Sequence, residues 1–186
     1  MKDLTKGRPS VLILTFALPI FLANLLQLTY SLADTRIVGT FLGDNALAAV
    51  GATTTLSNLI VQFLMGMCNG FAIISAQCFG AKDMDRLRRS LGNSLVLGLL
   101  AAVVLTFGGL VFLQPILRFL NVPENLLNTA TQYVSVIIAG LVITLLYDVL
   151  SATLRAIGDT VTPLIVLAVS VVLNIGGDLL LIVVLH

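Results

Sequence analysis

Long apolar segments alternate with short polar ones along the whole chain. Residues 11–33 contain no charged side chain, and each later apolar run ends at charges, glycine or proline. A bilayer core of about 30 Å needs roughly 20 apolar residues per helix, so this pattern predicts five membrane-spanning helices in an all-α, polytopic fold. We expect these helices at about residues 10–38, 46–79, 91–113, 126–157 and 161–185.

The composition supports a membrane environment. Of the 186 residues, 58% are hydrophobic and 10% are charged, and the mean hydropathy is +1.08. An ordinary soluble domain is about 45–50% apolar and about 25% charged. The alternating pattern of a transmembrane β-barrel is absent. With a net charge of only +1, the sequence gives no sign of a nucleic-acid partner, and the lipid bilayer is the expected surrounding.

Basic residues predict the orientation by the positive-inside rule. Eight of the ten Lys and Arg residues fall on one side of the predicted helices. Only Arg36 and Arg118 fall on the other side. We therefore expect a multi-pass protein of the cell membrane with a cytoplasmic N-terminus. The chain stops one residue beyond an apolar run, without a polar tail, and this favours a truncated sequence over a complete five-helix protein.

Polar residues form stripes within two of the predicted helices. Carboxylates near the bilayer centre cost at least about 2.5–3.5 kcal/mol each, so they usually face a cavity or a partner. The first helix carries one face made of Asn24, Gln27, Ser31 and Asp34, and the fifth carries Ser170, Asn174 and Asp178. Counting at 1.5 Å per residue, Asp34 and Asp178 reach matching heights in the outer half of the membrane. Tyr133 of the fourth helix reaches the same level.

Two carboxylates in one apolar site favour binding of a proton or of a monovalent cation that replaces it. Pro19, in the same helix as Asp34, offers a place where that helix could bend when the charge changes. The sequence therefore predicts a switch operated by a small cation.

Each of these residues also has a simpler structural interpretation. Asp34 could be an interfacial residue paired with Arg36, single polar residues often join helices, and Tyr133 alone is typical of an aromatic belt. Asp148 belongs to a separate stripe in the inner half that ends at Arg155. For Asp148 we favour a partly buried ion pair or a helix-interface residue.

Enzymatic chemistry is the weakest alternative. The only histidine is His186, and no nucleophile with a base or metal-ligand cluster is visible. Cys68 and Cys78 lie ten residues apart in one predicted helix and cannot bridge each other. We expect no catalytic residues, no cofactor and no metal beyond a possible sodium ion.

Several short motifs resemble the multidrug and toxic compound extrusion (MATE) family, in its N-terminal lobe. They are Pro19 before ADTRIVG, then LAAVGA (47–52), SAQCFGAKD (75–83), LRAIGDTVTP (154–163) and NIGGD (174–178). Their order and spacing cover essentially the whole chain. We interpret the loop motifs as scaffold, with Gly80 as a helix C-cap and Asp159 or Thr160 as an N-cap.

The resemblance implies twelve helices in two six-helix lobes, and export of drugs or other organic cations in exchange for sodium ions or protons. The residues that match the family's N-lobe cation and substrate site are Asp34, Tyr133, Asn174 and Asp178. Gln27 is expected to line the cavity and Pro19 to mark the helix bend. Helix 6 and the C-terminal lobe are missing from the sequence.

Two other readings stay open. A lipid-linked sugar flippase has a related fold, but its cavity favours basic residues, whereas acids lie within the helices here. A non-transporting membrane module would fit the lack of a sixth helix.

Overall fold

The computed structural model describes residues 9–41 and 43–180, except for the side chains of Pro9, Asn45, Asp178 and Leu179. This part of the chain folds into α-helices without a β-strand, which confirms the predicted all-α class. In chain order the helices are α1 (Pro9–Phe41), α2 (Gly43–Gly80), α3 (Met84–Phe119), α4 (Glu124–Ala139), α5 (Leu141–Ala156) and α6 (Val161–Leu179).

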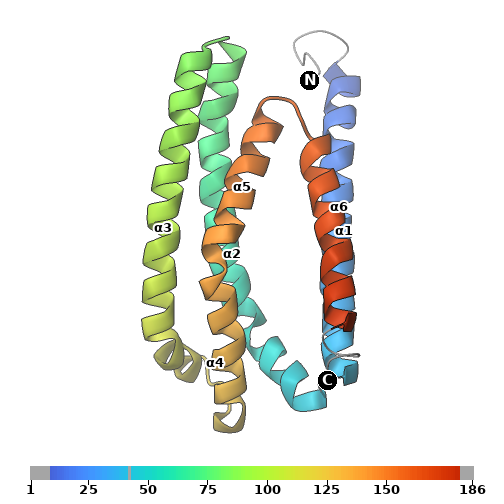
Figure 1. Ribbon diagram of the computed structural model, residues 1–186, viewed down its shortest axis with the longest axis vertical. Helices are drawn as coiled ribbons and strands as arrows, with labels where there is room; N and C mark the ends of the chain where they lie inside the picture. The colour runs from blue at the N-terminus through green and yellow to red at the C-terminus, as the bar shows by residue number, and fades with distance from the viewer. Residues whose placement is uncertain (1–8, 42, 181–186) are drawn as a thin grey trace. The chain divides into compact units, whose positions relative to one another are not determined.

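The chain divides into two compact units. The first comprises residues 1–44 and 157–186, and the second comprises residues 45–156. In the first unit α1 and α6 lie side by side and run in the same direction (Figure 1). In the second unit α2 and α3 run in opposite directions (Figure 1), and α3 packs against both α4 and α5.

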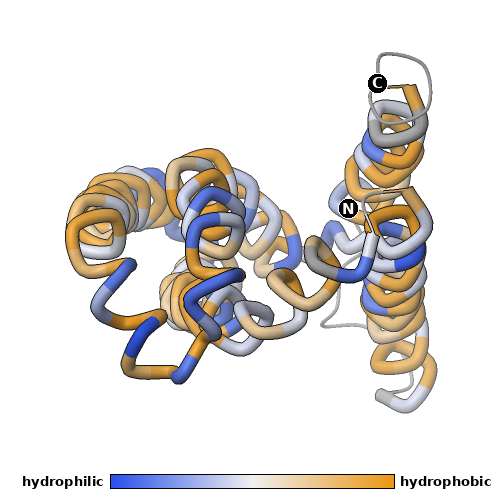
Figure 2. The backbone as a smooth tube through the Cα atoms, turned by 90° about the horizontal axis from the view of Figure 1, so that it is seen from below, coloured by the Kyte–Doolittle hydropathy of each residue, from blue (hydrophilic) through white to orange (hydrophobic). Residues whose placement is uncertain are grey.

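The helices have the length and composition of membrane spans. By these criteria α1, α2 and α3 can each cross a bilayer, and α4 with α5 can form a fourth, broken span. The described part of α6 contains a shorter apolar helix, Val161–Gly177. Hydrophobic residues dominate the helices of both units (Figure 2).

The predicted helix at 126–157 is wrong in one respect, because the structure has two helices there. At Gly140 the backbone N–H donates to the oxygens of Val136 (3.0 Å) and Ile137 (3.1 Å), and Ile143 N–H donates to Gly140 O (3.0 Å). The bonds to Ile137 O and from Ile143 N–H span three residues, and bonds of this length tighten the helix locally. The two helices differ in direction by 43°, so this span is bent.

The predicted third helix, 91–113, is too short. The structure extends it in both directions to Met84–Phe119. Asp83 caps the new N-terminus, where its Oδ1 accepts a hydrogen bond from Arg86 N–H (2.9 Å). The apolar run therefore marks the part of α3 that suits lipid, while the helix itself continues into the basic segment.

The turn after α2 differs from the expected glycine C-cap. The helix ends at Gly80 as expected, but the left-handed residue is Lys82, with φ of 59°. The N–H groups of Lys82 and Asp83 donate to Phe79 O (3.0 Å) and Cys78 O (3.1 Å). These bonds satisfy carbonyls at the end of α2, so the turn reverses the chain two residues later than predicted.

Asp159 caps α6. Its Oδ1 accepts from the N–H groups of Val161 (3.2 Å) and Thr162 (3.0 Å), and its Oδ2 accepts from the Thr162 hydroxyl (2.6 Å). Thr160 holds the N-cap position but makes no side-chain capping bond. The Thr162 hydroxyl, followed by the Thr162 and Val161 N–H groups, holds the pKa of Asp159 below its ordinary value.

Small residues allow α3 to pack closely on the bent span. A Cβ at Gly98 would lie 3.1 Å from two methyl carbons of Leu145, and a Cβ at Gly109 would lie 3.1 Å from Ile138 Cδ1. The Thr106 hydroxyl donates to Ile138 O (3.1 Å). Close packing of small residues and interhelical hydrogen bonds are the main attractions between helices in lipid, so α3 holds both α4 and α5.

Candidate functional site

The first unit contains the helices that carry the predicted cation site. On each helix the half-buried positions recur every three or four residues, which defines one contact face. On α1 these positions include Leu12, Phe16, Ala23, Leu26 and Tyr30, and on α6 they include Leu164, Leu167, Val171 and Ile175. Since α1 and α6 pack against each other, we take these faces as the seam of the pair.

The polar stripes lie beside this seam. On α1, Asn24, Gln27 and Ser31 each come one residue after a seam position, whereas on α6, Ser170 and Asn174 each come one residue before one. One residue turns an α-helix by about 100°. In two parallel helices that face each other, a forward turn on one and a backward turn on the other point the same way. Both polar stripes therefore lie on the same side of the pair.

The stripes approach the seam toward the C-terminal ends of the helices. From Asn24 to Asp34 the mean spacing is below the helical period of about 3.6 residues, and on α6 it is above that period, so the two stripes rotate toward each other. Asp34 is accordingly half-buried, whereas Asn24, Gln27 and Ser31 are exposed. Asp178 holds the next backbone position of the α6 stripe, but its side chain lies outside the described residues.

The remaining predicted site residues lie on α1, α4 and α6. Gln27 and Asn174 are exposed on the polar side of the first unit. Pro19 lies inside α1, which continues through it from Pro9 to Phe41. Tyr133 is half-buried on α4 of the second unit, and its part in the site stays a prediction. The structure thus brings together the helices that carry Asp34, Asn174 and Asp178.

Asp148 lies in the second unit and is only 7% exposed. Its predicted role as a helix-interface residue agrees with this burial. The predicted ion pair is wrong: the structure describes the side chains of both Asp148 and Arg155 and shows no salt bridge between them. The two residues lie seven positions apart on α5, or about 10 Å along the axis, which explains the missing contact.

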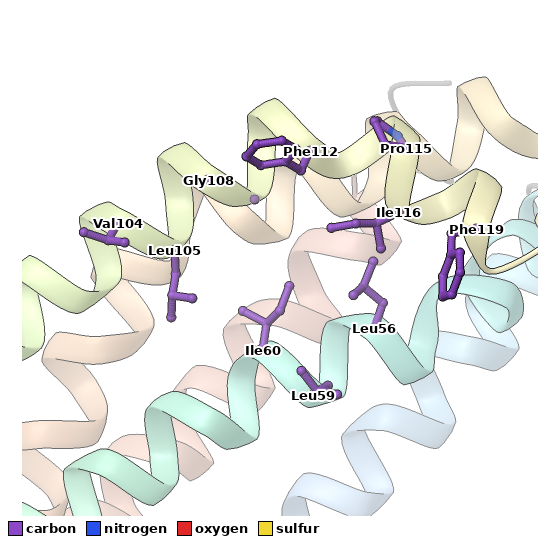
Figure 3. A pocket seen from close by; sticks show the side chains of 11 residues that line it. Leu56, Leu59, Ile60, Val104, Leu105, Gly108, Phe112, Pro115, Ile116 and Phe119 are labelled. Atoms are coloured by element: carbon purple, nitrogen blue, oxygen red, sulfur yellow. The ribbon is translucent and has the colours of Figure 1, made fainter.

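A groove between α2 and α3 was not predicted. It has a volume of about 660 Å³ and is lined by apolar side chains, including Leu56, Ile60, Leu105 and Phe112 (Figure 3). Its lining residues carry no charge, so it offers no ligand for a cation. In the sequence these residues are indistinguishable from other apolar positions of the two helices, and no signal could have identified the groove.

Comparisons with known proteins agree with the all-α fold. A model of the MatE family matches residues 19–180. The probable multidrug resistance protein YoeA of Bacillus subtilis is 35% identical over 173 residues, which are 92% of this chain and 37% of that protein.

Solved structures give the same result. A crystal structure of a MATE mutant has a TM-score of 0.89 and 26% identity, and covers 98% of this chain and 41% of the solved one. An outward-facing multidrug resistance MATE transporter of the MOP superfamily has a TM-score of 0.87 and 27% identity, with 96% and 40% covered. The chain thus spans about two fifths of the length of these relatives.

The family match covers most of the chain, and the helices superpose on those of solved transporters over nearly their whole length. Together with the apolar spans, these matches show that the chain is a multi-pass membrane protein of the MatE family.

Proposed function

We propose that the chain takes part in cation-coupled export of drugs or other organic cations, and that Asp34, Asn174 and Asp178 bind the coupling sodium ion or proton. The observation that carries this proposal is the placement of the two polar stripes on one side of the α1–α6 pair, turning toward the seam at Asp34 and at the backbone position of Asp178. The relatives are described as multidrug resistance proteins and transporters.

The chemistry of the stripe suits a small cation. Carboxylate and amide oxygens are hard ligands that suit alkali and alkaline-earth cations, and a carboxylate can take up a proton in their place. Because a charge inside a bilayer is costly, binding and release of the cation would change how stable each arrangement of α1 and α6 is. Such a difference in stability can drive alternation between two conformations. Pro19, which removes one backbone hydrogen bond from α1, is the proposed bending point.

Gln27 and Tyr133 are proposed to line the path of the organic cation. Gln27 lies one stripe position before Ser31 on the polar side of α1, and its amide can accept or donate hydrogen bonds. The aromatic face of Tyr133 can attract an organic cation. We also propose that the N-terminus is cytoplasmic. Fluorescent-protein fusions at each end of the chain would test this orientation.

The central test is Asp34→Asn, with Asp44→Asn as the matched control. Asp44 is an exposed acid in the first turn of α2, outside both stripes. In proteoliposomes with an imposed sodium or pH gradient, Asp34→Asn should abolish coupled efflux of a fluorescent organic cation, whereas Asp44→Asn should keep it. Equal insertion of the two variants is checked by protease protection. Undiminished coupled efflux with Asp34→Asn would contradict the assignment.

A direct binding measurement separates the site from transport. Isothermal titration of the purified protein with sodium chloride, at a pH low and a pH high enough to change proton competition, should show binding that Asp34→Asn removes. If neither sodium binding nor proton release depends on Asp34, the proposed cation site is wrong even if the chain transports.

A further inference from the structure

Asp148 is the only buried acid in the part of the chain that the structure describes. Its Oδ2 atom is fully enclosed and has no hydrogen-bond partner among the described residues. Most buried polar atoms in native proteins do have a partner, and the exceptions need an explanation, such as a bound ion or a functional role. This carboxyl group lies in the second unit, whereas the two stripes lie on α1 and α6 of the first.

The residues next to Asp148 on α5 are uncharged, and one of them, Ser151, carries a buried hydroxyl. Val149 and Ala152, its neighbours on α5, are at most 2% exposed, and so is Cys68 of α2. Asp148 acts electrostatically on Cys68, and Arg155 acts on Asp148. From α3, the side facing this part of α5 presents Gly98, which is not titratable. Cys68 and Arg155 are therefore the titratable and charged groups that face Asp148.

None of these neighbours neutralises an ionised carboxylate by direct contact. Arg155 makes no salt bridge with Asp148 among the described side chains, and a thiol is only a weak donor. Breaking or omitting the partner of a buried charge is strongly destabilising. A proton on Asp148 removes the charge and also turns the carboxylate into a hydrogen-bond donor.

A metal or alkali cation is a poorer solution than a proton. Within the described residues no group of three or more His, Cys, Asp or Glu side chains lies together, so oxygen ligands are few. We propose that Asp148 is a proton-binding site within the second unit, occupied when α5 is packed in the fold and vacated when the carboxyl group reaches water.

Proton binding at Asp148 predicts a specific pH dependence of stability. Between the carboxyl pKa of the unfolded chain, about 3.9, and that of the folded protein, the folded protein holds one proton more, so the unfolding equilibrium constant rises about tenfold per pH unit. Asp148→Asn cannot lose a proton and should lack this slope. The proposal concerns the second unit alone, and it stands or falls independently of cation binding at Asp34.

The experiment compares wild type, Asp148→Asn and the matched control Asp85→Asn, whose acid is exposed. In detergent micelles, from about pH 4 upward, unfolding of wild type and Asp85→Asn should show this slope relative to Asp148→Asn until the pH passes the carboxyl pKa of folded Asp148. Infrared spectra should contain a protonated-carboxyl C=O band that Asp148→Asn lacks and Asp85→Asn keeps. Equal slopes, or an unchanged band in Asp148→Asn, would overturn the proposal.

Two further experiments test the proposal if Asp148→Asn does not fold or if a sodium ion binds instead of a proton. If Asp148→Asn does not fold, Asp148→Glu retains a carboxyl group and should shift the infrared band, whereas an unshifted band would assign it to another acid and overturn the proposal. Replacing potassium by sodium at constant pH should not change wild-type stability relative to Asp148→Asn. A sodium-dependent gain confined to wild type would show that the ligand is a sodium ion and that the proton assignment is wrong.

Discussion

Replacing Gly98 by alanine tests whether α3 is held at close range against α5. The added Cβ would lie 3.1 Å from both methyl carbons of Leu145 and 3.4 Å from its Cγ, inside the carbon–carbon optimum of about 3.5–4.0 Å. Leu145 is completely buried, so it cannot swing away. Overpacking of this kind costs about 1–3 kcal/mol, which is partly offset by about 1 kcal/mol of helix propensity.

Gly92 supplies the matched control on the same helix. A Cβ there meets nothing within 4 Å, so Gly92→Ala should gain up to about 1 kcal/mol from propensity alone. The two alanine variants should then differ by about 1–3 kcal/mol in the free energy of unfolding. Gly98→Val should lower this free energy further than Gly98→Ala does.

The assay is unfolding of the purified protein in mixed micelles by increasing sodium dodecyl sulfate, followed by circular dichroism. A double-mutant cycle sharpens it: in the Leu145→Ala background, Gly98→Ala should lose its penalty, because the clashing methyl groups are gone. If Gly98→Ala and Gly92→Ala stabilise the protein equally, the close contact between α3 and α5 does not exist in solution.

Three further outcomes are expected. Asp159→Ala removes the acceptor for two backbone N–H groups at the start of α6 and should cost about 0.5–2 kcal/mol in the free energy of unfolding, whereas Asp159→Asn should cost less; equal losses would show that the cap is not the cause. The Thr162 hydroxyl and N–H groups lower the pKa of Asp159. Its contribution to stability is therefore full above the ordinary Asp pKa of about 3.9 and declines as the pH falls below that value. An acid titration of wild type against Asp159→Ala should show the two free energies of unfolding converging only below that pH. Thr106→Val keeps the side-chain volume but removes the hydroxyl that donates to Ile138 O, and it should destabilise the protein by about 0.6 kcal/mol; a gain in stability would refute a role for that bond.

Hydrophobic periodicity predicted the helices well and their ends less well. The apolar run of the third span ends at Leu113, but α3 continues to Phe119 through Pro115 and begins at Met84, before the run starts. Lipid solubility and helix formation are separate properties, because charged residues that leave the bilayer can still be good helix formers. A boundary placed at the first charge therefore shortens the helix.

The bend at Gly140 could not be derived from local sequence. The segment 126–157 reads as one apolar helix, and a single glycine inside it is tolerated in many helices. α4 and α5 each pack against α3, at Ile138 and Leu145, and such tertiary contacts are not visible in the local sequence pattern. For the site, the spacing of Asn24, Gln27, Ser31 and Asp34 identified the polar face of α1, but only the parallel pairing with α6 relates it to Asn174.

The contacts of α3 also determine what the bend at Gly140 can do. Gly109 fixes α3 against Ile138 on the α4 arm, and Gly98 fixes it against Leu145 on the α5 arm. A helix attached to both arms of an elbow holds the elbow at one angle. The 43° bend is therefore part of the packing of the second unit.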